Sequence, residues 1–312
     1  MTRRAGLFVL ALTALALSSP LFAPYESGRA FRDYLHAPPM RPHLSGLAAP
    51  VAHPLVLADR LEQRYEPDPV RTVPLPWFAA AEDDPVFLLG SDSFGRDVLS
   101  RLLYGARTSI SLALVATLGA VLIGALAGAW AGYRGGWIDE SVMRVADFVL
   151  VLPVIYVVVV LRAVLPLVLP ASTVFLLVSW IFVVVGWPFV AKGVRAIVSA
   201  ERDREYVQAA RSLGAGPARI LVHHLIPACA GYLVVQATLL LPAFILAEAT
   251  LSYVGLGFPD PVASWGTMLA ETANIGSVAR FPWTLAPAGA IFVVVLCTNL
   301  LTSERSSKMT ID

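Results

Sequence analysis

Charged residues are scarce in this chain. Asp, Glu, Lys and Arg make up only 14% of the 312 residues, and the formal net charge is +1. A nucleic-acid-binding protein needs a basic surface to pair with phosphates, so we expect no nucleic-acid partner. Hydrophobic residues make up 57%, above the roughly 45–50% of soluble domains. The composition therefore predicts a membrane protein.

Lysine is nearly absent, and common catalytic motifs are missing. The two lysines are Lys192 and Lys308, and neither follows a glycine. A P-loop needs Gly-Lys followed by Ser or Thr, so this chain has none. The His-Glu-x-x-His helix and the Gly-x-Ser-x-Gly turn are absent as well. We expect a protein that is not an enzyme and binds no cofactor, and any ATP hydrolysis belongs to another polypeptide.

Cysteine is also rare. Cys229 and Cys297 lie far apart within apolar segments, which predicts packing residues and neither a disulfide framework nor a metal site. His36, His43 and His53 lie in a proline-rich segment, where solvated histidines are a simpler interpretation than metal ligands.

Long apolar runs dominate the rest of the chain. Charge is absent between Arg107 and Arg134, Arg162 and Lys192, Arg219 and Glu248, and Arg280 and Glu304. Each run can cross ~30 Å of hydrocarbon, which takes about 20 helical residues. Residues 142–161 and 5–23 are further candidates. The expected fold is an all-α polytopic membrane protein with six transmembrane helices.

The six spans divide the chain into four parts. Residues 1–24 form the first transmembrane helix, and residues 25–104 form a loop-rich, proline-rich extracytoplasmic cap that ends in an interfacial helix. Residues 105–303 form a five-helix core that contains a cytoplasmic loop at 193–224. Residues 304–312 form a cytoplasmic tail. A cleavable signal peptide is the alternative for the first run, although Pro24 would hinder cleavage.

Basic residues indicate the orientation. The 193–224 loop and its flanks carry Lys192 and several arginines. Short loops rich in Lys and Arg face the cytoplasm, so we expect both termini in the cytoplasm and a chain that crosses the membrane several times.

Residues 205–227 (EYVQAARSLGAGPARILVHHLIP) predict a short helix, a glycine stop and a second helix. Tyr206, Ala210 and Leu213 share one face of the first helix. Gly214 lies where a left-handed residue ends a helix, and Pro217 lies where a new helix begins. The small, exposed face predicts a helix offered to a partner protein, and the alternative is a helix lying on the lipid surface.

This segment resembles the EAA loop of permease subunits of binding-protein-dependent ABC importers. The matching residues are Ala209, Ala210, Gly214 and Pro227, while Gln208 replaces the acidic residue of the motif. The resemblance implies that this loop docks into a separate ATPase. The residues expected to act in this coupling are Glu205, Tyr206, Gln208, Ala209, Ala210, Leu213, Gly214 and Pro227.

Four blocks extend the resemblance to the C-type permeases of dipeptide, oligopeptide and nickel importers. They are residues 90–97 (GSDSFGRD), 132–140 (GYRGGWIDE), 251–257 (LSYVGLG) and 264–266 (SWG). The resemblance implies the type I importer permease fold. It also implies four partners: a second homologous permease forming a heterodimer, two ATP-binding subunits that carry ATP and Mg, and an extracytoplasmic solute-binding protein. Membrane lipid surrounds the chain. The cargo stays open among dipeptides, oligopeptides, nickel chelates and peptide antibiotics.

Ionisable residues within spans are costly and invite a functional question. We expect Asp147 to be structural and to pair with Arg144 near the cytoplasmic face. We expect Glu248, with Ser252 one turn later, to line the translocation path or its outer gate. An ion-coupled secondary transporter of small peptides is the alternative function, but it would need inverted repeats and charges at mid-membrane, and the sequence shows neither.

Overall fold

The computed structural model describes residues 14, 16–44, 50–60, 62–75, 77, 84–153, 156, 159–160, 169–273 and 275–309. These residues belong to two compact units. The first contains Leu112–Ala247 and Val294–Asp312, and the second contains Leu12–Ser111 and Glu248–Val293. Each unit is described by itself.

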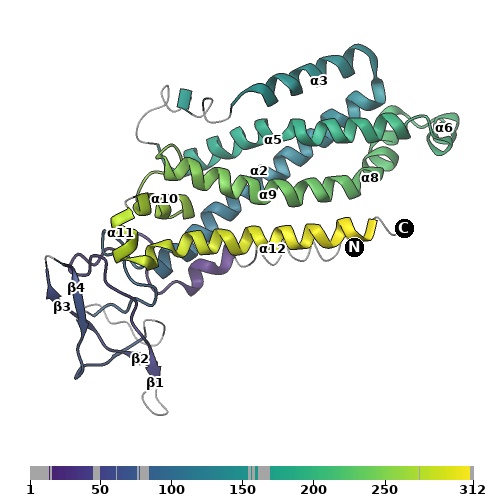
Figure 1. Cartoon of the computed structure of the whole chain (residues 1–312). Coiled ribbons are helices and arrows are strands. Elements are labelled where there is room, and N and C mark those ends of the chain that lie inside the picture. The colour runs from purple at the N-terminus through teal and green to yellow at the C-terminus, as the bar shows by residue number, and fades with distance from the viewer. Residues whose placement is uncertain are drawn as a thin grey trace. The chain divides into compact units, whose positions relative to one another are not determined.

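Long helices account for most of the chain (Figure 1). They are α2 (Val98–Arg134), α3 (Gly136–Val151), α5 (Ala171–Glu201), α9 (Ala230–Tyr253) and α12 (Ala286–Met309). Within the described part of the chain, four stretches are long and apolar enough to cross a membrane: Val98–Arg134, Ala171–Glu201, Ala230–Tyr253 and Pro282–Leu300. These four stretches correspond to the four charge-free runs of the sequence.

The other two expected spans are not established. Most of the first, residues 5–23, lies outside the described residues, which there include only the 3₁₀ turn η1 (Ser19–Phe22) and a few neighbours. Of the span expected at residues 142–161, the structure describes the part within α3 (Gly136–Val151) and residues 152–153, 156 and 159–160, and the rest lies outside the described residues. The 16 residues of α3 extend about 24 Å, short of the ~30 Å of hydrocarbon. The count of six stays a prediction.

The predicted interfacial helix is the first part of α2. This helix runs without a break for 37 residues, so the interfacial helix and the second span are one element. The helix begins at Val98, directly after Asp97. The Asp97 Oδ2 accepts hydrogen bonds from the Ser100 N–H at 2.8 Å and from the Ser100 hydroxyl at 2.6 Å. Asp97 therefore takes the capping role.

Small residues bring α2 and α5 together in the first unit. A Cβ placed on Gly128 would lie 2.3 Å from the Ala191 carbonyl oxygen, and one placed on Gly124 would lie 2.6 Å from Val190 Cβ. Either distance is too short for any side chain, so glycine permits the close contact. This small face of α2 thus packs against a helix of its own chain. α3 lies along α5 on another side (Figure 1).

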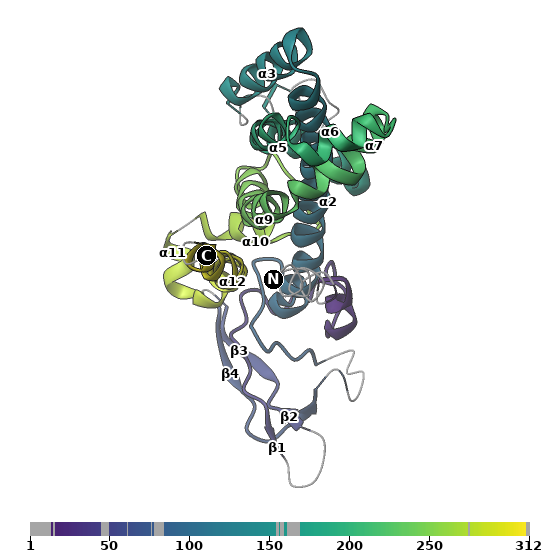
Figure 2. The same ribbon diagram turned by 90° about the vertical axis from the view of Figure 1, so that its right-hand side faces the viewer.

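The cap contains more regular structure than the sequence predicted. Its strands are β1 (His43–Leu44), β2 (Pro50–Ala52), β3 (Leu55–Asp59), β4 (Arg64–Pro67) and β5 (Val73–Pro74). They form an antiparallel sheet in the order β1-β2-β5 and a separate β3-β4 hairpin. Buried residues such as Met40, Val86 and Phe87 form a small core beneath them. Figure 2 shows the strands from the side.

Short helices complete the second unit. They are α10 (Trp265–Ala270), η3 (Glu271–Ala273), α11 (Ile275–Arg280) and η4 (Pro282–Leu285). Ser264 caps α10 through a reciprocal pair with Thr267: the Ser264 Oγ accepts from the Thr267 N–H at 3.1 Å, and the Thr267 Oγ1 accepts from the Ser264 N–H at 2.9 Å. This capping box fixes where the helix begins.

Candidate functional site

The segment expected to contact a partner consists of α6 (Glu205–Ser212), α7 (Pro217–Ile220), the π-turn η2 (Leu221–Leu225) and α8 (Ile226–Ala228). We call residues 205–228 the α6–α8 segment. The predicted loop at 193–224 begins too early, because α5 remains helical through Glu201. The last turns of α5 carry Lys192 and Arg195, whose charges had suggested a loop. Figure 2 shows α6 and α7 side by side.

The helix stop at Gly214 is confirmed. Gly214 has a φ of +83°, in the region that glycine adopts at little cost. Its N–H donates to the Arg211 carbonyl at 2.9 Å, and the Ala215 N–H donates to the Ala210 carbonyl at 3.0 Å. These two bonds are the Schellman pattern that closes a helix C-terminus. Pro217 opens α7, also as expected.

Pro227 lies inside α8, whereas the sequence predicted a proline leading from a helix back into the membrane. Proline has no N–H to donate to the preceding turn, and the preceding residues Leu221–Leu225 take the wider π-turn. The chain therefore passes from α7 to α9 through a distorted but nearly continuous helical path, since α9 begins at Ala230.

The apolar stripe of α6 faces away from the rest of its unit. Val207 is fully buried and anchors the helix, whereas Tyr206 is 42% exposed and Leu213 is 89% exposed. Glu205, Gln208 and Ala209 are exposed as well. An exposed leucine at a rigid helix end is a natural contact point for another protein.

Polar side chains hold α6 in place. The Tyr206 hydroxyl donates to Glu201 Oε2 at 2.8 Å, and the Gln208 Nε2 donates to the Asp203 carbonyl at 3.0 Å. Gln208, which replaces the acidic residue of the motif, thus binds the backbone of the turn that precedes α6. The Arg211 guanidinium lies 5.2 Å from the centre of the Tyr133 ring on α2, a cation–π distance.

Ion pairs join α3 to α5 beneath this segment. Asp147 pairs with Lys192, so the expected pairing of Asp147 with Arg144 is wrong. Arg144 pairs instead with Glu140, four residues earlier on α3. Arg195 makes a bidentate contact with Asp139, and this contact lowers the pKa of the Asp139 carboxyl. Asp147 thus takes its partner from a different helix, and its structural role stays a prediction.

A second group of polar residues surrounds Glu248 on α9. The Glu248 carboxylate is 1% exposed. It accepts hydrogen bonds from the Ser109 hydroxyl at 2.6 Å and from the Ser252 hydroxyl at 2.7 Å. Among the described residues, it has no salt-bridge partner. A buried carboxylate without a cation is stabilised by such donors.

The two serines also form hydrogen bonds with the loop that follows α9. The Ser109 Oγ accepts from the Trp265 N–H, and the Ser252 Oγ accepts from the Phe258 N–H, both at 3.2 Å. We call this chain of bonds the Glu248 relay. It connects α2 and α9 to two points of the segment between α9 and α10. Ser109 was missed from the sequence, where a polar residue within a predicted span was the only signal.

Two glycines allow the loop of the Glu248 relay to lie directly against α9. A Cβ on Gly257 would lie 2.1 Å from the Ser252 Oγ, and one on Gly266 would lie 2.5 Å from the Ala249 carbonyl oxygen. Residues 251–257 and 264–266 were identified by resemblance alone. Their glycines permit the loop backbone to touch α9.

A third polar group, which we call the ion cluster, surrounds Arg96. Arg96 is 4% exposed and contacts Asp92 at 2.6 Å, Asp260 at 2.8 Å and Glu271 at 3.1 Å. Arg101 lies 3.5 Å from the same Asp92 oxygen. Residues 90–97 were matched only as a family block, and the pairing of Arg96 with Glu271 left no signal in the sequence.

Carboxyl groups in the ion cluster and beside it resist ionisation. Burial raises the pKa of Asp97 to about 6. Burial also raises the pKa of Glu271, and the nearby Asp92 charge adds to that increase. Desolvation penalises the charged form of a carboxyl group.

The described residues include no group of three metal-ligating side chains, and Cys229 and Cys297 are free thiols.

The sequence is similar to known transport proteins. A family model described as "Binding-protein-dependent transport system inner membrane component" matches residues 120–303. The oligopeptide transport system permease protein OppC of Bacillus subtilis is 38% identical over 214 residues, which are 68% of this chain and 67% of that protein. The di/tripeptide transport system permease protein DppC of Pseudomonas aeruginosa is 32% identical over 297 residues, 95% of this chain and 82% of that protein.

A solved structure of the MetNI methionine ABC transporter, in an inward-facing conformation, also matches. It is 18% identical, with a TM-score of 0.49, over 65% of this chain and 93% of that one.

Proposed function

Because this chain belongs to the family of inner membrane components of binding-protein-dependent transport systems, the permease components of ABC importers and not enzymes, we propose that it carries peptides. The support is the similarity to permeases named for oligopeptides and for di- and tripeptides. An ion-coupled carrier is not favoured, since the family works with a separate binding protein. The chain is a multi-pass membrane protein and forms half of the translocation pathway.

The α6–α8 segment is the contact with the ATPase. The observation that carries this assignment is the rigid, exposed end of α6, where Leu213 is 89% exposed beside the fixed turn at Gly214. A stiff helix transmits displacement, and an exposed apolar side chain gives a partner groove something to bind. Movement of the two ATP-binding subunits would shift α6 and, through Val207 and Arg211, the helices behind it. The amphipathic-helix alternative is less suited, because α6 presents few large apolar groups.

The remaining partners follow from the same assignment. A second homologous permease completes the pathway as a heterodimer, and an extracytoplasmic binding protein delivers the cargo. ATP and Mg belong to the ATPase subunits. The α6–α8 segment and both termini face the cytoplasm of a prokaryotic cell, and the cap of residues 25–104 faces the other side.

Glu248 and Ser252 serve the outer gate by holding its loop. The relay fixes the backbone at Phe258 and Trp265, so opening of this loop must break bonds to the two serine hydroxyls that Glu248 orients. In this assignment Glu248 controls the position of the loop and does not touch the peptide.

Purification from native membranes in mild detergent tests the proposal. The account expects a second permease and P-loop ATPases to accompany this chain. In proteoliposomes containing these subunits and the binding protein, a tripeptide should accumulate only with ATP. Uptake that continues without ATP but follows an ion gradient would refute the assignment.

A further inference from the structure

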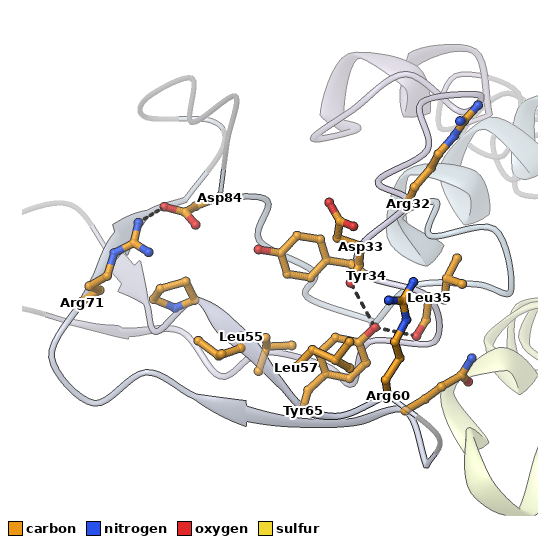
Figure 3. A pocket seen from close by; sticks show the side chains of 13 residues that line it. Arg32, Asp33, Tyr34, Leu35, Leu55, Leu57, Arg60, Tyr65, Arg71 and Asp84 are labelled. Carbon is orange, nitrogen blue, oxygen red and sulfur yellow. Dashed lines mark hydrogen bonds and ion pairs between the residues drawn. The ribbon is translucent and has the colours of Figure 1, made fainter.

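The cap contains a cavity that the permease function does not use. It measures about 530 Å³ and lies between the β3–β4 hairpin and residues 32–35 (Figure 3). Small-molecule sites commonly occupy about 300–1,000 Å³ and combine an apolar lining with a few polar groups. All residues that line the cavity belong to the second unit.

One side of the cavity is apolar and rigid. The rings of Tyr34 and Tyr65 stack with centroids 6.4 Å apart and planes 12° apart. The Tyr65 hydroxyl donates to the Leu35 carbonyl at 2.9 Å. Leu57 lies directly opposite Tyr65 in the hairpin register, so both side chains project from the same face. Leu55, two residues earlier, extends this face toward the Arg71 end.

Some charged side chains that line the cavity have an ion-pair partner, and others have none. At one end Arg71 and Asp84 form an ion pair. On the other side of Tyr34, Figure 3 shows the Arg60 guanidinium beside Tyr65 and Leu35, whereas Arg32 extends away from both tyrosines. Within the part of the chain that the structure describes, neither Arg60 nor Asp33 has an ion-pair partner. The cavity therefore offers one guanidinium group and one carboxylate beside an apolar surface.

We propose that this cavity binds a short peptide with free termini. The inference rests on the proposed peptide transport and extends it to a second, extracytoplasmic contact with the cargo. Arg60 receives the α-carboxylate, for which a guanidinium is the natural partner. Asp33 receives the α-ammonium group. Leu57 and the two tyrosines pack against a peptide side chain without selecting one sequence, as a permease for varied peptides requires.

A peptide fits this combination of charged groups and apolar surface better than an inorganic anion or a fatty acid does. An inorganic anion would gain nothing from the leucine and tyrosine surface, and a fatty acid would leave Asp33 without a partner. Burial raises the pKa of Tyr65 to about 12, so this wall stays neutral at physiological pH and does not repel a carboxylate.

The test uses the purified full-length permease pair without its binding protein. Affinity for the tripeptide Ala-Phe-Ala is measured by calorimetry, alongside its C-terminal amide and its N-acetyl form. Each blocked terminus should weaken binding by about tenfold, since a hydrogen-bonded charge contributes roughly 1.5–3 kcal/mol. Arg60→Glu should weaken the free peptide by at least that factor and abolish the preference over the amide.

Arg64→Glu is the matched control, because Arg64 is an exposed arginine on the same hairpin but does not line the cavity. Leu57→Glu should weaken all three ligands alike. Thermal unfolding of each variant verifies that the cap remains folded. Affinity that is equal for the peptide and its amide, or unchanged by Arg60→Glu, would overturn the proposal.

Uptake distinguishes this inference from the proposed function. If the assembled importer accumulates the tripeptide with ATP while Arg60→Glu leaves peptide affinity unchanged, the cavity assignment is wrong and peptide transport stands. If Arg60→Glu lowers uptake without changing that affinity, the cavity contacts the binding protein, and the peptide-site proposal is equally wrong. If no peptide is transported at all, the proposed function itself is wrong.

Discussion

Leu213 at the end of α6 is 89% exposed, whereas Glu248 on α9 is 1% exposed and Arg101 near the start of α2 is also 1% exposed. An apolar side chain thus lies in the open in one region, and charged side chains are buried in another. Most residues of the α6–α8 segment are exposed. The Glu248 relay and the ion cluster, in contrast, satisfy most of their polar groups among their own residues.

This difference separates contact surfaces from positioning elements. An exposed leucine contributes little to the stability of its own chain, so its presence is explained by what it meets. A buried charge is costly unless it is paired and hydrogen-bonded, so its partners determine the local backbone. Mutations in the two regions should therefore act on different observables: stability in one and communication between subunits in the other.

The largest loss of stability is expected for Arg96→Ala. This change leaves the buried Asp92 and the mostly buried Glu271 without the Arg96 guanidinium. Breaking a buried ion pair by removing one member costs about 3–5 kcal/mol. Thermal unfolding in detergent, followed by tryptophan fluorescence, measures the effect. Arg64→Ala removes an exposed ion pair with Glu66 and should cost under about 1 kcal/mol. Equal effects of the two changes would contradict the assigned importance of the ion cluster.

The next largest effect is a pH dependence. In the folded state the pKa of Asp97 is about 6, above the value of about 3.9 in an unfolded chain. The folded state therefore holds the proton more tightly, and the free energy of unfolding falls as pH rises between these values, by up to about 3 kcal/mol. Burial of Glu271 acts in the same direction.

Asp97→Asn tests this assignment, because asparagine keeps an acceptor for Ser100 but does not titrate. Unfolding curves collected from pH 4 to pH 7 should show a smaller decline for the variant than for the wild type. An identical decline in both proteins would remove Asp97 as its source.

A smaller effect is expected at the end of α6. Gly214→Val forces a β-branched residue to a φ of +83°, which costs about 1–2 kcal/mol. Uptake should fall far more than stability, because the Schellman turn sets the direction of α6. Gly216→Ala is the control: Gly216 has a φ of −72° and open space around its Cα. Coupled uptake that survives Gly214→Val would show that this turn is not needed.

Glu248→Gln should cost about 1 kcal/mol, since an amide keeps one acceptor but presents N–H groups to the second serine. The loop that contains Phe258 and Trp265 should open more readily. Hydrogen exchange at these two amides should accelerate, and uptake should decrease while assembly is retained. Unchanged exchange would show that the carboxylate does not position the loop.

Local features of this fold were predictable from the sequence. Gly214 and Pro217 reveal their roles because a helix end depends on neighbouring residues. The four charge-free runs were identified correctly because their length alone fits a bilayer.

Long-range pairs were not predictable. Arg96 meets Glu271 across 175 positions, and Lys192 meets Asp147 across 45. Such contacts leave no period or motif in one sequence. The strands of the cap were missed because each is only 2–5 residues long, too short for an alternating pattern to emerge.

The most direct test of the central claim is Leu213→Asp. Since Leu213 is 89% exposed, the variant should unfold at the temperature of the wild type. The account predicts that the purified permease pair no longer retains its ATPase subunits. Peptide-stimulated ATP hydrolysis should fall at least about tenfold, because a few side chains at the centre of an interface supply most of its binding energy. Normal ATPase recovery together with normal ATP-driven uptake would contradict the assignment of α6 as the coupling contact.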